Sequence, residues 1–235
     1  MKHRADALLQ LAQAAYLDRL LPPRDPLLAE MEVAAAAADV PIADPEVGRL
    51  LTVLARATRA RRIVEIGTAI GYGALCLARG APAAEVVTID QDPAMLERAR
   101  GYLERAGVAD RVRLIEGVAL EAIPALDGRF DLAWVDAAKA EYRRYLDLLL
   151  PKIEVGGTLA FDNLLWAGLV ADPDAGGEDG EDAGGPDPAS ADALRAFNGY
   201  LMMHPQLAAV VLPFGDGVGL AVKTKPLISE LGGPF

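Results

Sequence analysis

The chain has 235 residues, 52% of them hydrophobic and 24% charged, which suits one large folded domain or two small ones with an ample core. Its formal net charge of −11 argues against nucleic acid as a partner, because phosphate contacts need clustered lysine and arginine side chains. The single cysteine, Cys76, excludes an internal disulfide and a cysteine-rich metal site. We expect this thiol to be packed rather than reactive, in a reducing, cytoplasmic compartment.

The first 60 residues are expected to form a helical cover over the rest of the chain, or a surface for oligomer formation. Apolar side chains recur at helical spacing over residues 5–21, 26–38 and 45–60, and prolines mark the borders between these segments. Charged residues interrupt the first segment, so we expect no signal peptide. No run of about 18 apolar residues predicts a membrane span.

Between residues 61 and 225 the pattern alternates between short apolar strands and helices. Strands are expected over residues 63–66, 86–89, 112–115, 132–135 and 158–161, with helices near residues 72–79, 93–106, 120–126 and 141–150. This alternation predicts right-handed βαβ units and a parallel sheet with helices on both faces. After a helix over residues 188–203, two strands at 206–212 and 217–223 can close as a hairpin. The whole chain is therefore expected to be one α/β domain with a mostly parallel seven-stranded sheet and an antiparallel edge strand.

The segment 171–188 interrupts the alternation and is predicted to be a flexible acidic loop inserted into the core. It consists of glycine, proline, alanine and acids, and cannot bury enough apolar surface to offset the entropy of ordering it. Seven acidic residues lie between Asp172 and Asp187, so the rest of the chain is only mildly acidic. A lid over a substrate mouth is the alternative to a loop without function.

The stretch Arg61–Ala78 predicts a strand, a glycine-rich turn and the start of a helix. Gly67, Gly71 and Gly73 give the spacing G-x-x-x-G-x-G, which differs from the G-x-G-x-x-G of a dinucleotide site and from a phosphate loop. A pyrophosphate ligand, and with it a nicotinamide dehydrogenase, is therefore disfavoured. Glu65, at the end of the strand, would repel phosphates and favour a cationic or hydroxyl-rich ligand. An ordinary turn with glycines for packing is the alternative.

Four expected strands end in an acidic residue, at the edge where open α/β sheets bind ligands. These residues are Glu65, Asp90, Asp136 and Asp162, the last followed by Asn163. Asp90 lies about 20 residues past the glycine turn, where nucleoside-binding folds hydrogen-bond a ribose hydroxyl. A solvated turn aspartate is the alternative.

Asp136, Asp162 and Asn163 offer three oxygen ligands from two neighbouring strand ends. No cysteine or histidine lies nearby in the sequence, so such a site suits Mg²⁺, Mn²⁺ or Ca²⁺ rather than zinc. A simple turn at Asp162 and Asn163 is the alternative. Lys139 stands at an expected helix start, where the helix dipole disfavours a cation, and this placement indicates a function. An exposed lysine beside Glu141 is the alternative there.

Five segments together resemble the cation-dependent O-methyltransferases, the family that includes catechol and caffeoyl-CoA O-methyltransferases. They are Glu65–Tyr72, Thr88–Asp90, Val135–Tyr142, Asp162–Gly168 and Leu212–Gly217. The resemblance implies a Rossmann-like methyltransferase fold that uses S-adenosylmethionine (SAM). It also implies methylation of one hydroxyl of a small aromatic with vicinal hydroxyls, and a homodimer. No membrane partner is expected, because the sequence has no apolar run long enough to span a membrane. Metal-independent methylation of another acceptor and a non-catalytic SAM-binding module are the alternatives.

The resemblance further implies roles for individual residues. On the cofactor side, Glu65, Gly67 and Tyr72 would line the methionine, Asp90 would hold the ribose, and Gly117 and Ala119 would lie by the adenine. Thr68, Gly71, Gly73 and Asp136 would complete the cofactor-binding set. On the acceptor side, Asp136, Asp162 and Asn163 would hold the cation, with Mg²⁺ the expected ion, and Trp166 would contact the substrate. Lys139 would be the general base, or the cation that stabilises the phenolate.

The chain departs from the family pattern at two positions. Gly73 stands where a small hydroxyl residue is common, so one contact to the cofactor carboxylate would be lost or taken by water. Ala138 stands at the second acid of an Asp-Ala-Asp-Lys pattern, and only Asp136 of this segment is expected to meet the metal.

Overall fold

The computed structural model describes residues 11–20, 22–23, 25–172 and 187–224. Most of the predicted acidic loop therefore lies outside the described residues, as does the first part of the helix predicted over residues 5–21.

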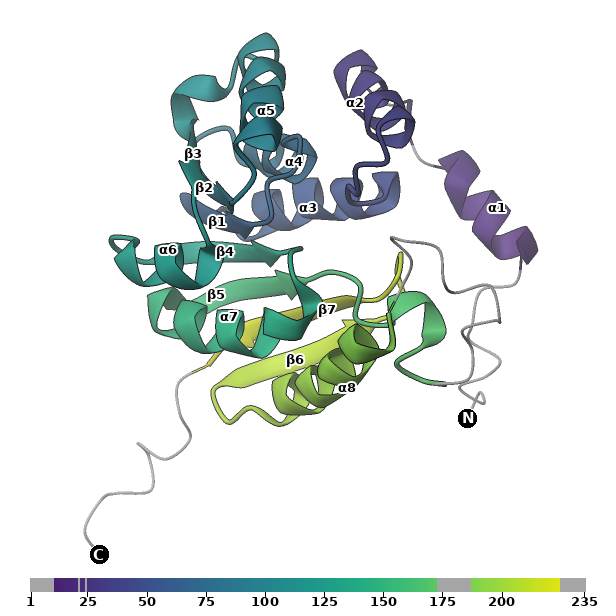
Figure 1. Cartoon of the computed structure of the whole chain (residues 1–235), viewed down its shortest axis with the longest axis vertical. Helices are drawn as coiled ribbons and strands as arrows, with labels where there is room; N and C mark the ends of the chain where they lie inside the picture. The colour runs from purple at the N-terminus through teal and green to yellow at the C-terminus, as the bar shows by residue number, and fades with distance from the viewer. Residues whose placement is uncertain (1–10, 21, 24, 173–186, 225–235) are drawn as a thin grey trace, which may run out of the picture.

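The described strands form one seven-stranded sheet in the order β3-β2-β1-β4-β5-β7-β6 (Figure 1). They are β1 (Arg62–Ile66), β2 (Glu85–Asp90), β3 (Val112–Glu116), β4 (Phe130–Val135), β5 (Ile153–Phe161), β6 (Leu207–Leu212) and β7 (Val218–Lys223). The first five strands pair in parallel, whereas β7 runs antiparallel to both β5 and β6. The predicted mostly parallel sheet with an antiparallel edge and a closing hairpin is confirmed.

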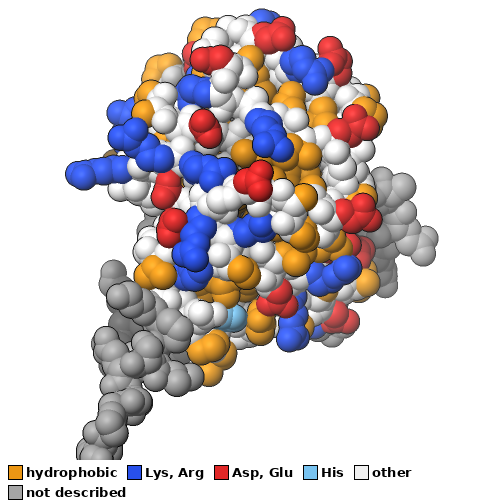
Figure 2. Space-filling model, turned by 90° about the vertical axis from the view of Figure 1, so that its left-hand side faces the viewer, with side chains coloured by type: hydrophobic (Ala, Val, Ile, Leu, Met, Phe, Trp, Pro, Cys, Tyr) orange, Lys and Arg blue, Asp and Glu red, His pale blue; other side chains and the backbone are white. Residues whose placement is uncertain are grey.

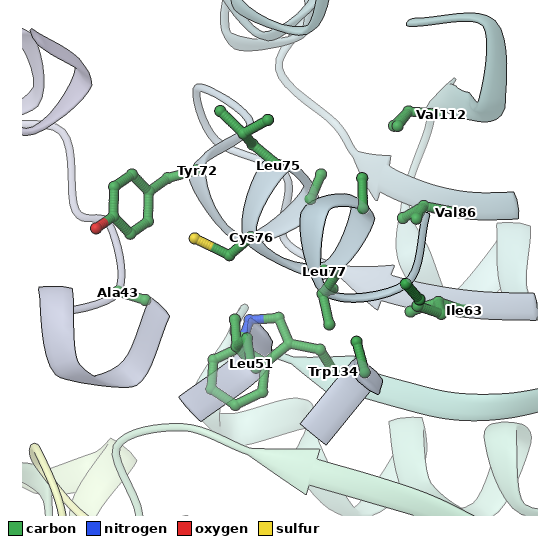
Figure 3. Packing of buried hydrophobic residues seen from close by; sticks show 14 of the residues in the cluster. Ala43, Leu51, Ile63, Tyr72, Leu75, Cys76, Leu77, Val86, Val112 and Trp134 are labelled. Atoms are coloured by element: carbon green, nitrogen blue, oxygen red, sulfur yellow. The ribbon is translucent and has the colours of Figure 1, made fainter. Parts of the chain in front are cut away.

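Helices cover both faces of this sheet, because alternate residues of each buried strand point to opposite sides. The helices are α1 (Leu11–Leu20), α2 (Pro26–Ala37), α3 (Pro45–Ala57), α4 (Tyr72–Gly80), α5 (Pro93–Arg105), α6 (Ala119–Ala125), α7 (Tyr142–Leu149) and α8 (Pro188–Met203). Ile63 belongs to the core beneath α3, α4 and α5, part of which is drawn in Figure 3, and the next residue, Val64, belongs to the core beneath α6, α7 and α8. Both cores are apolar and continuous along the strands.

Four of the helices begin at an Asp-Pro step. Proline suits the first helical position because its missing N–H would have had no partner there. The preceding aspartate supplies a cap: the Asp25 carboxylate accepts the backbone N–H of Leu27 at 2.9 Å, and Asp92 and Asp187 cap α5 and α8 in the same way. Asp44 precedes α3 without a side-chain cap bond, and its carboxylate is thus available for another contact.

Two boundaries of described elements differ by three or more residues from the sequence-based expectation. β5 begins at Ile153, five residues before the predicted start, because Gly156 and Gly157 sit within the strand at a shift of register against β4 rather than in a turn before it. The third helix ends at Ala57 instead of residue 60, since Arg59 has a left-handed backbone with φ of 52°.

The surface gives two further observations. On the side of the molecule shown in Figure 2, acidic and basic side chains are interspersed with apolar ones. Within the described ranges, no helix combines the length and apolar composition needed to cross a membrane. Tyr16, Leu17 and Leu20 of α1 are exposed apolar side chains. The predicted homodimer stays a prediction.

Candidate active site

A cavity of about 940 Å³ opens where the parallel strands end, at the edge that binds ligands in open α/β sheets. Thirteen of the predicted site residues line it. They are Glu65, Gly67, Thr68, Tyr72, Gly73, Asp90, Gly117, Ala119, Asp136, Lys139, Asp162, Asn163 and Trp166. The predicted cofactor-binding and acceptor-binding groups therefore share one space.

The glycines of the turn after β1 have different roles. Gly67 has φ of 94°, and a Cβ atom there would overlap the carbonyl oxygen of Asp136, so the turn lies directly on the end of β4. Gly71, with φ of 86°, begins α4 and packs against Ala99 of α5. Gly71 is the predicted cofactor residue that does not line the cavity, and packing accounts for its presence.

Asp90 fixes the conformation of the same turn. Its Oδ2 atom accepts the backbone N–H groups of Thr68 at 3.0 Å and Ala69 at 2.8 Å, and its Oδ1 atom accepts that of Asp92 at 3.0 Å. A carboxylate has about four acceptor positions, so one remains for a ligand hydroxyl. The backbone N–H of Gly117 donates to the Asp90 carbonyl at 2.9 Å, which brings the start of α6 beside it.

Glu65 is fully buried at the floor of the part of the cavity that the predicted cofactor residues line, which we call the cofactor side. Its Oε2 atom accepts the Thr88 hydroxyl at 2.5 Å, and the Thr88 and Thr68 hydroxyl oxygens lie 2.6 Å apart. Burial is the main cause that raises the pKa of Glu65 to about 8. The hydrogen bond from Thr88 lowers this pKa, whereas the negative charges of Asp136 and Asp90 raise it further. The carboxyl group is therefore protonated at neutral pH unless a cationic group approaches it.

The position of Glu65 explains the first departure from the family pattern. A Cβ atom at Gly73 would overlap Oε1 of Glu65 and come within 3.4 Å of the Trp134 indole nitrogen. Glycine at this position makes room for the glutamate side chain.

Tyr72 connects the site to the N-terminal helices. Its hydroxyl lies 2.8 Å from Oε1 of Glu32 on α2, and its ring packs against Gly48 of α3. Figure 3 shows the ring directed toward the chain segment that carries Ala43. The helical cover thus holds one wall of the cofactor side.

The Lys139 side chain is nearly buried, and its ammonium group makes two hydrogen bonds. Its ammonium donates to Oδ1 of Asp136 at 2.7 Å and to the Tyr142 hydroxyl at 2.9 Å. Burial lowers the pKa of Lys139, but Tyr142 and Asp136 outweigh that effect and raise it above its usual value. In this arrangement the side chain is a charged donor with one ammonium hydrogen left for a ligand.

Two carboxylates and an amide, those of Asp136, Asp162 and Asn163, line the part of the cavity predicted for the acceptor, which we call the acceptor side. Asp162 is 3% exposed, and burial followed by the charge of Asp136 raises its pKa to about 7. The Asn163 side chain lies beside the Asp216 carboxylate and opposes the rise that burial causes in the pKa of that group. Because a carboxylate only accepts, the favoured orientation of the amide turns its nitrogen toward Asp216 and leaves its oxygen for a ligand. Three hard oxygen donors fit a small divalent cation.

No three histidine, cysteine, aspartate or glutamate side chains gather as a metal site in the part of the chain that the structure describes. The predicted set has only two such side chains, and the Asn163 amide completes it.

The chain after β5 has an unusual backbone. Asn163, Trp166 and Ala167 have φ of 56°, 49° and 50°, in the left-handed region that costs a non-glycine residue on the order of 1–3 kcal/mol. Asparagine tolerates this region, but tryptophan and alanine seldom adopt it. Their conformation therefore depends on the surrounding structure, and Asp216 contributes to it by accepting the Ala167 N–H at 2.8 Å.

Several lining residues were not predicted as site residues. They include Asp44 before α3, Gln91, Trp134, Glu141, Tyr145, Asp187, Ser190 and Asp216. Asp216 stands between two glycines in the hairpin loop. An acidic residue in a loop that adjoins the strand ends could have been predicted from the sequence as a site residue. Asp44 could not have been predicted in this way. It lies in the connection between α2 and α3, and only the three-dimensional packing brings this connection to the cavity.

A sequence model described as O-methyltransferase matches residues 25–224. The chain belongs to this family. Over 205 residues it is 37% identical to the catechol O-methyltransferase of Mycobacterium tuberculosis, covering 84% of this chain and 86% of that protein. It is 36% identical to tricin synthase 1 of Oryza sativa subsp. japonica, covering 72% and 69% of the two chains.

Solved structures agree with this assignment. The O-methyltransferase TomG of Streptomyces achromogenes, in complex with SAM, has a TM-score of 0.77 and 33% identity, covering 90% of this chain and 95% of that one. The SAH-bound methyltransferase PaMTH1 of Podospora anserina has a TM-score of 0.81 and 28% identity, covering 96% and 98%. The chain is thus a SAM-dependent O-methyltransferase with the Rossmann-like fold of its relatives.

Proposed function

We propose that this O-methyltransferase methylates one hydroxyl of a small aromatic with vicinal hydroxyls, and that it requires a divalent cation. The observation that carries the proposal is the shared cavity: Asp136, Lys139, Asp162 and Asn163 line the same space as the glycine turn. The likeness to a catechol O-methyltransferase supports the same substrate class.

The cation would be held by Asp136, Asp162 and Asn163, with Mg²⁺ the proposed ion and Mn²⁺ or Ca²⁺ the alternatives. When bound, such an ion lowers the pKa of an acceptor hydroxyl and orients two adjacent oxygens. The raised pKa of Asp162 supports this assignment. Burial and the nearby Asp136 carboxylate disfavour the ionised form of Asp162, and a bound cation would stabilise that form.

Lys139 would act on the acceptor oxygen as a charged hydrogen-bond donor. Its ammonium is paired with Asp136 and its pKa is raised, so it is suited to stabilise a phenolate rather than to remove the proton. This favours the second of the two roles that the family resemblance implies. The indole of Trp166, 5.8 Å from the Lys139 ammonium at its ring centre, would provide a flat wall for the aromatic ring of the acceptor.

On the cofactor side, Glu65 would oppose the positive charge of SAM, and Asp90 would bind a ribose hydroxyl with its remaining acceptor position. Gly117 and Ala119 would border the adenine. The approach of the cationic donor would favour the ionised form of Glu65, so we expect SAM to bind with release of a proton.

The test is a methylation assay with SAM and a panel of catechols, hydroxycinnamates and monophenols. Each compound is assayed after chelation and again after addition of Mg²⁺, and products are identified by mass spectrometry. We expect turnover only with vicinal hydroxyls and only with the cation, and its loss in Asp162→Ala but not in Asp192→Ala, an exposed aspartate on α8. Turnover that survives chelation and the Asp162→Ala change would favour metal-independent methylation of another acceptor.

A further inference from the structure

The loop between β6 and β7 holds the strained segment 163–167 chiefly through Asp216. Its carboxylate accepts the backbone N–H of Ala167 at 2.8 Å and lies beside the Asn163 side chain, while its carbonyl oxygen accepts the N–H of Leu165 at 2.9 Å. The next residue, Gly217, accepts the N–H of Leu164 at 2.8 Å. Three residues after β5, Leu164, Leu165 and Ala167, are thus bonded to two residues of the hairpin loop.

These bonds are needed because the segment does not keep its conformation by local preference. Trp166 and Ala167 both have left-handed backbones, and the Ala167 N–H that Asp216 accepts lies between them. The Trp166 indole has one further anchor, a 3.0 Å hydrogen bond from Nε1 to the carbonyl oxygen of Asp187. Removal of the Asp216 carboxylate leaves the strained peptide without its closest acceptor.

The same carboxylate lies beside the Asn163 amide. It accepts only, so it favours the orientation in which the amide nitrogen faces Asp216 and the amide oxygen points away. A glutamine or asparagine oxygen is a cation ligand, whereas the nitrogen is not. Asp216 therefore acts on the acceptor side twice, through Asn163 and through Trp166, although it lies in a loop far from both in the sequence.

We propose that Asp216 is a positioning residue that holds Asn163 and Trp166 in the arrangement required for binding the acceptor. The proposal rests on the proposed function for its effect on catalysis. Its effect on the structure, the ordering of residues 163–167, is independent of any ligand.

The structural effect is tested on the ligand-free protein by tryptophan fluorescence. The chain has two tryptophans. Trp134 is 1% exposed and shielded from acrylamide, so the quenchable emission reports Trp166, which is only partly buried. In Asp216→Ala we expect red-shifted emission and faster quenching. Asp192→Ala is the matched control, because this exposed aspartate pairs only with Arg195 on its own helix, and we expect it to behave as wild type.

Asp216→Asn covers the case in which Asp216→Ala does not fold. Asparagine has nearly the same shape but carries a donor NH₂ group in place of one carboxylate oxygen, so it keeps only one of the two acceptor atoms of Asp216. We expect its quenching to lie between wild type and Asp216→Ala. Quenching and emission identical to wild type in a folded variant would overturn the proposal.

The catalytic effect is tested by steady-state kinetics on the same variants. Misplacement by about 1 Å can cost on the order of 100-fold in rate, so we expect kcat/KM for a catechol to fall roughly 10- to 100-fold in Asp216→Ala. The KM for SAM should not change, since the cofactor side is built from other elements. A KM for SAM that rises as much as the KM for the catechol would indicate general damage and overturn the proposal. Wild-type protein without activity on any catechol would refute the proposed function and leave the fluorescence result to stand.

Discussion

Replacing Glu65 with glutamine is expected to change how the stability of the protein depends on pH. The pKa of this buried carboxyl is about 8 in the folded protein, against 4.5 for the ordinary group. Between these two values the folded state keeps a proton that the unfolded chain releases. The free energy of unfolding therefore decreases as pH rises through this window, by about 1.4 kcal/mol per pH unit.

Across the window the contribution amounts to roughly 3–5 kcal/mol, because full burial leaves the group unscreened. Glutamine has the same shape and no proton to lose. We therefore expect Glu65→Gln and wild type to be about equally stable at pH 5, and the variant to be more stable by several kcal/mol at pH 8. Other titrating groups, including Asp162, are present in both proteins and cancel in the difference.

Urea unfolding followed by circular dichroism at pH 5, 6, 7 and 8 measures this difference. Glu154→Gln serves as the control, since Glu154 is half exposed on β5 and its replacement should give a pH-independent offset. A stability difference between Glu65→Gln and wild type that is constant from pH 5 to pH 8 would refute the reasoning. It would mean that the Thr88 hydroxyl keeps Glu65 ionised despite its burial.

Three further outcomes are expected. Lys139→Ala should lower kcat on a catechol by ~100-fold or more, and Lys139→Arg should recover part of it if the residue stabilises the phenolate; an arginine variant as inactive as the alanine variant would instead point to a general base. Gly73→Ser should raise the KM for SAM and lower the melting temperature, because its side chain must displace Glu65; an unchanged melting temperature would show that Glu65 moves freely. The thiol of Cys76 is buried with its pKa raised to about 12, so it should react with a thiol reagent only as fast as the protein unfolds; rapid labelling of the native protein would contradict the described packing.

The sequence is sufficient to predict the sheet and the strand-end acids because both follow from short-range patterns. Parallel strands bring their carboxyl ends to one edge, so Glu65, Asp90, Asp136 and Asp162 were expected to meet without knowledge of the packing. The alternation of strands and helices likewise predicted parallel pairing within the first part of the sheet, although no strand order was predicted from it.

The parts that could not be predicted depend on contacts between distant segments. Nothing local to Trp166 and Ala167 predicts a left-handed backbone, which exists because Asp216 and its loop fold over them. The conflict between Gly73 and the Glu65 side chain also appears only in three dimensions. Lys139 was predicted as a functional residue from its placement in the sequence. Its pairing with Asp136, on which the proposed role as a charged donor rests, is visible only in the three-dimensional structure.

The close packing of Gly67 on the Asp136 carbonyl has a consequence for altering this enzyme. The backbone that carries the donor turn rests on the backbone of a residue whose side chain faces the acceptor. Under the proposed function, the distance between methyl donor and acceptor would depend on this contact between two main-chain segments. Substitutions at Trp166 would then change the space for the acceptor without changing that contact.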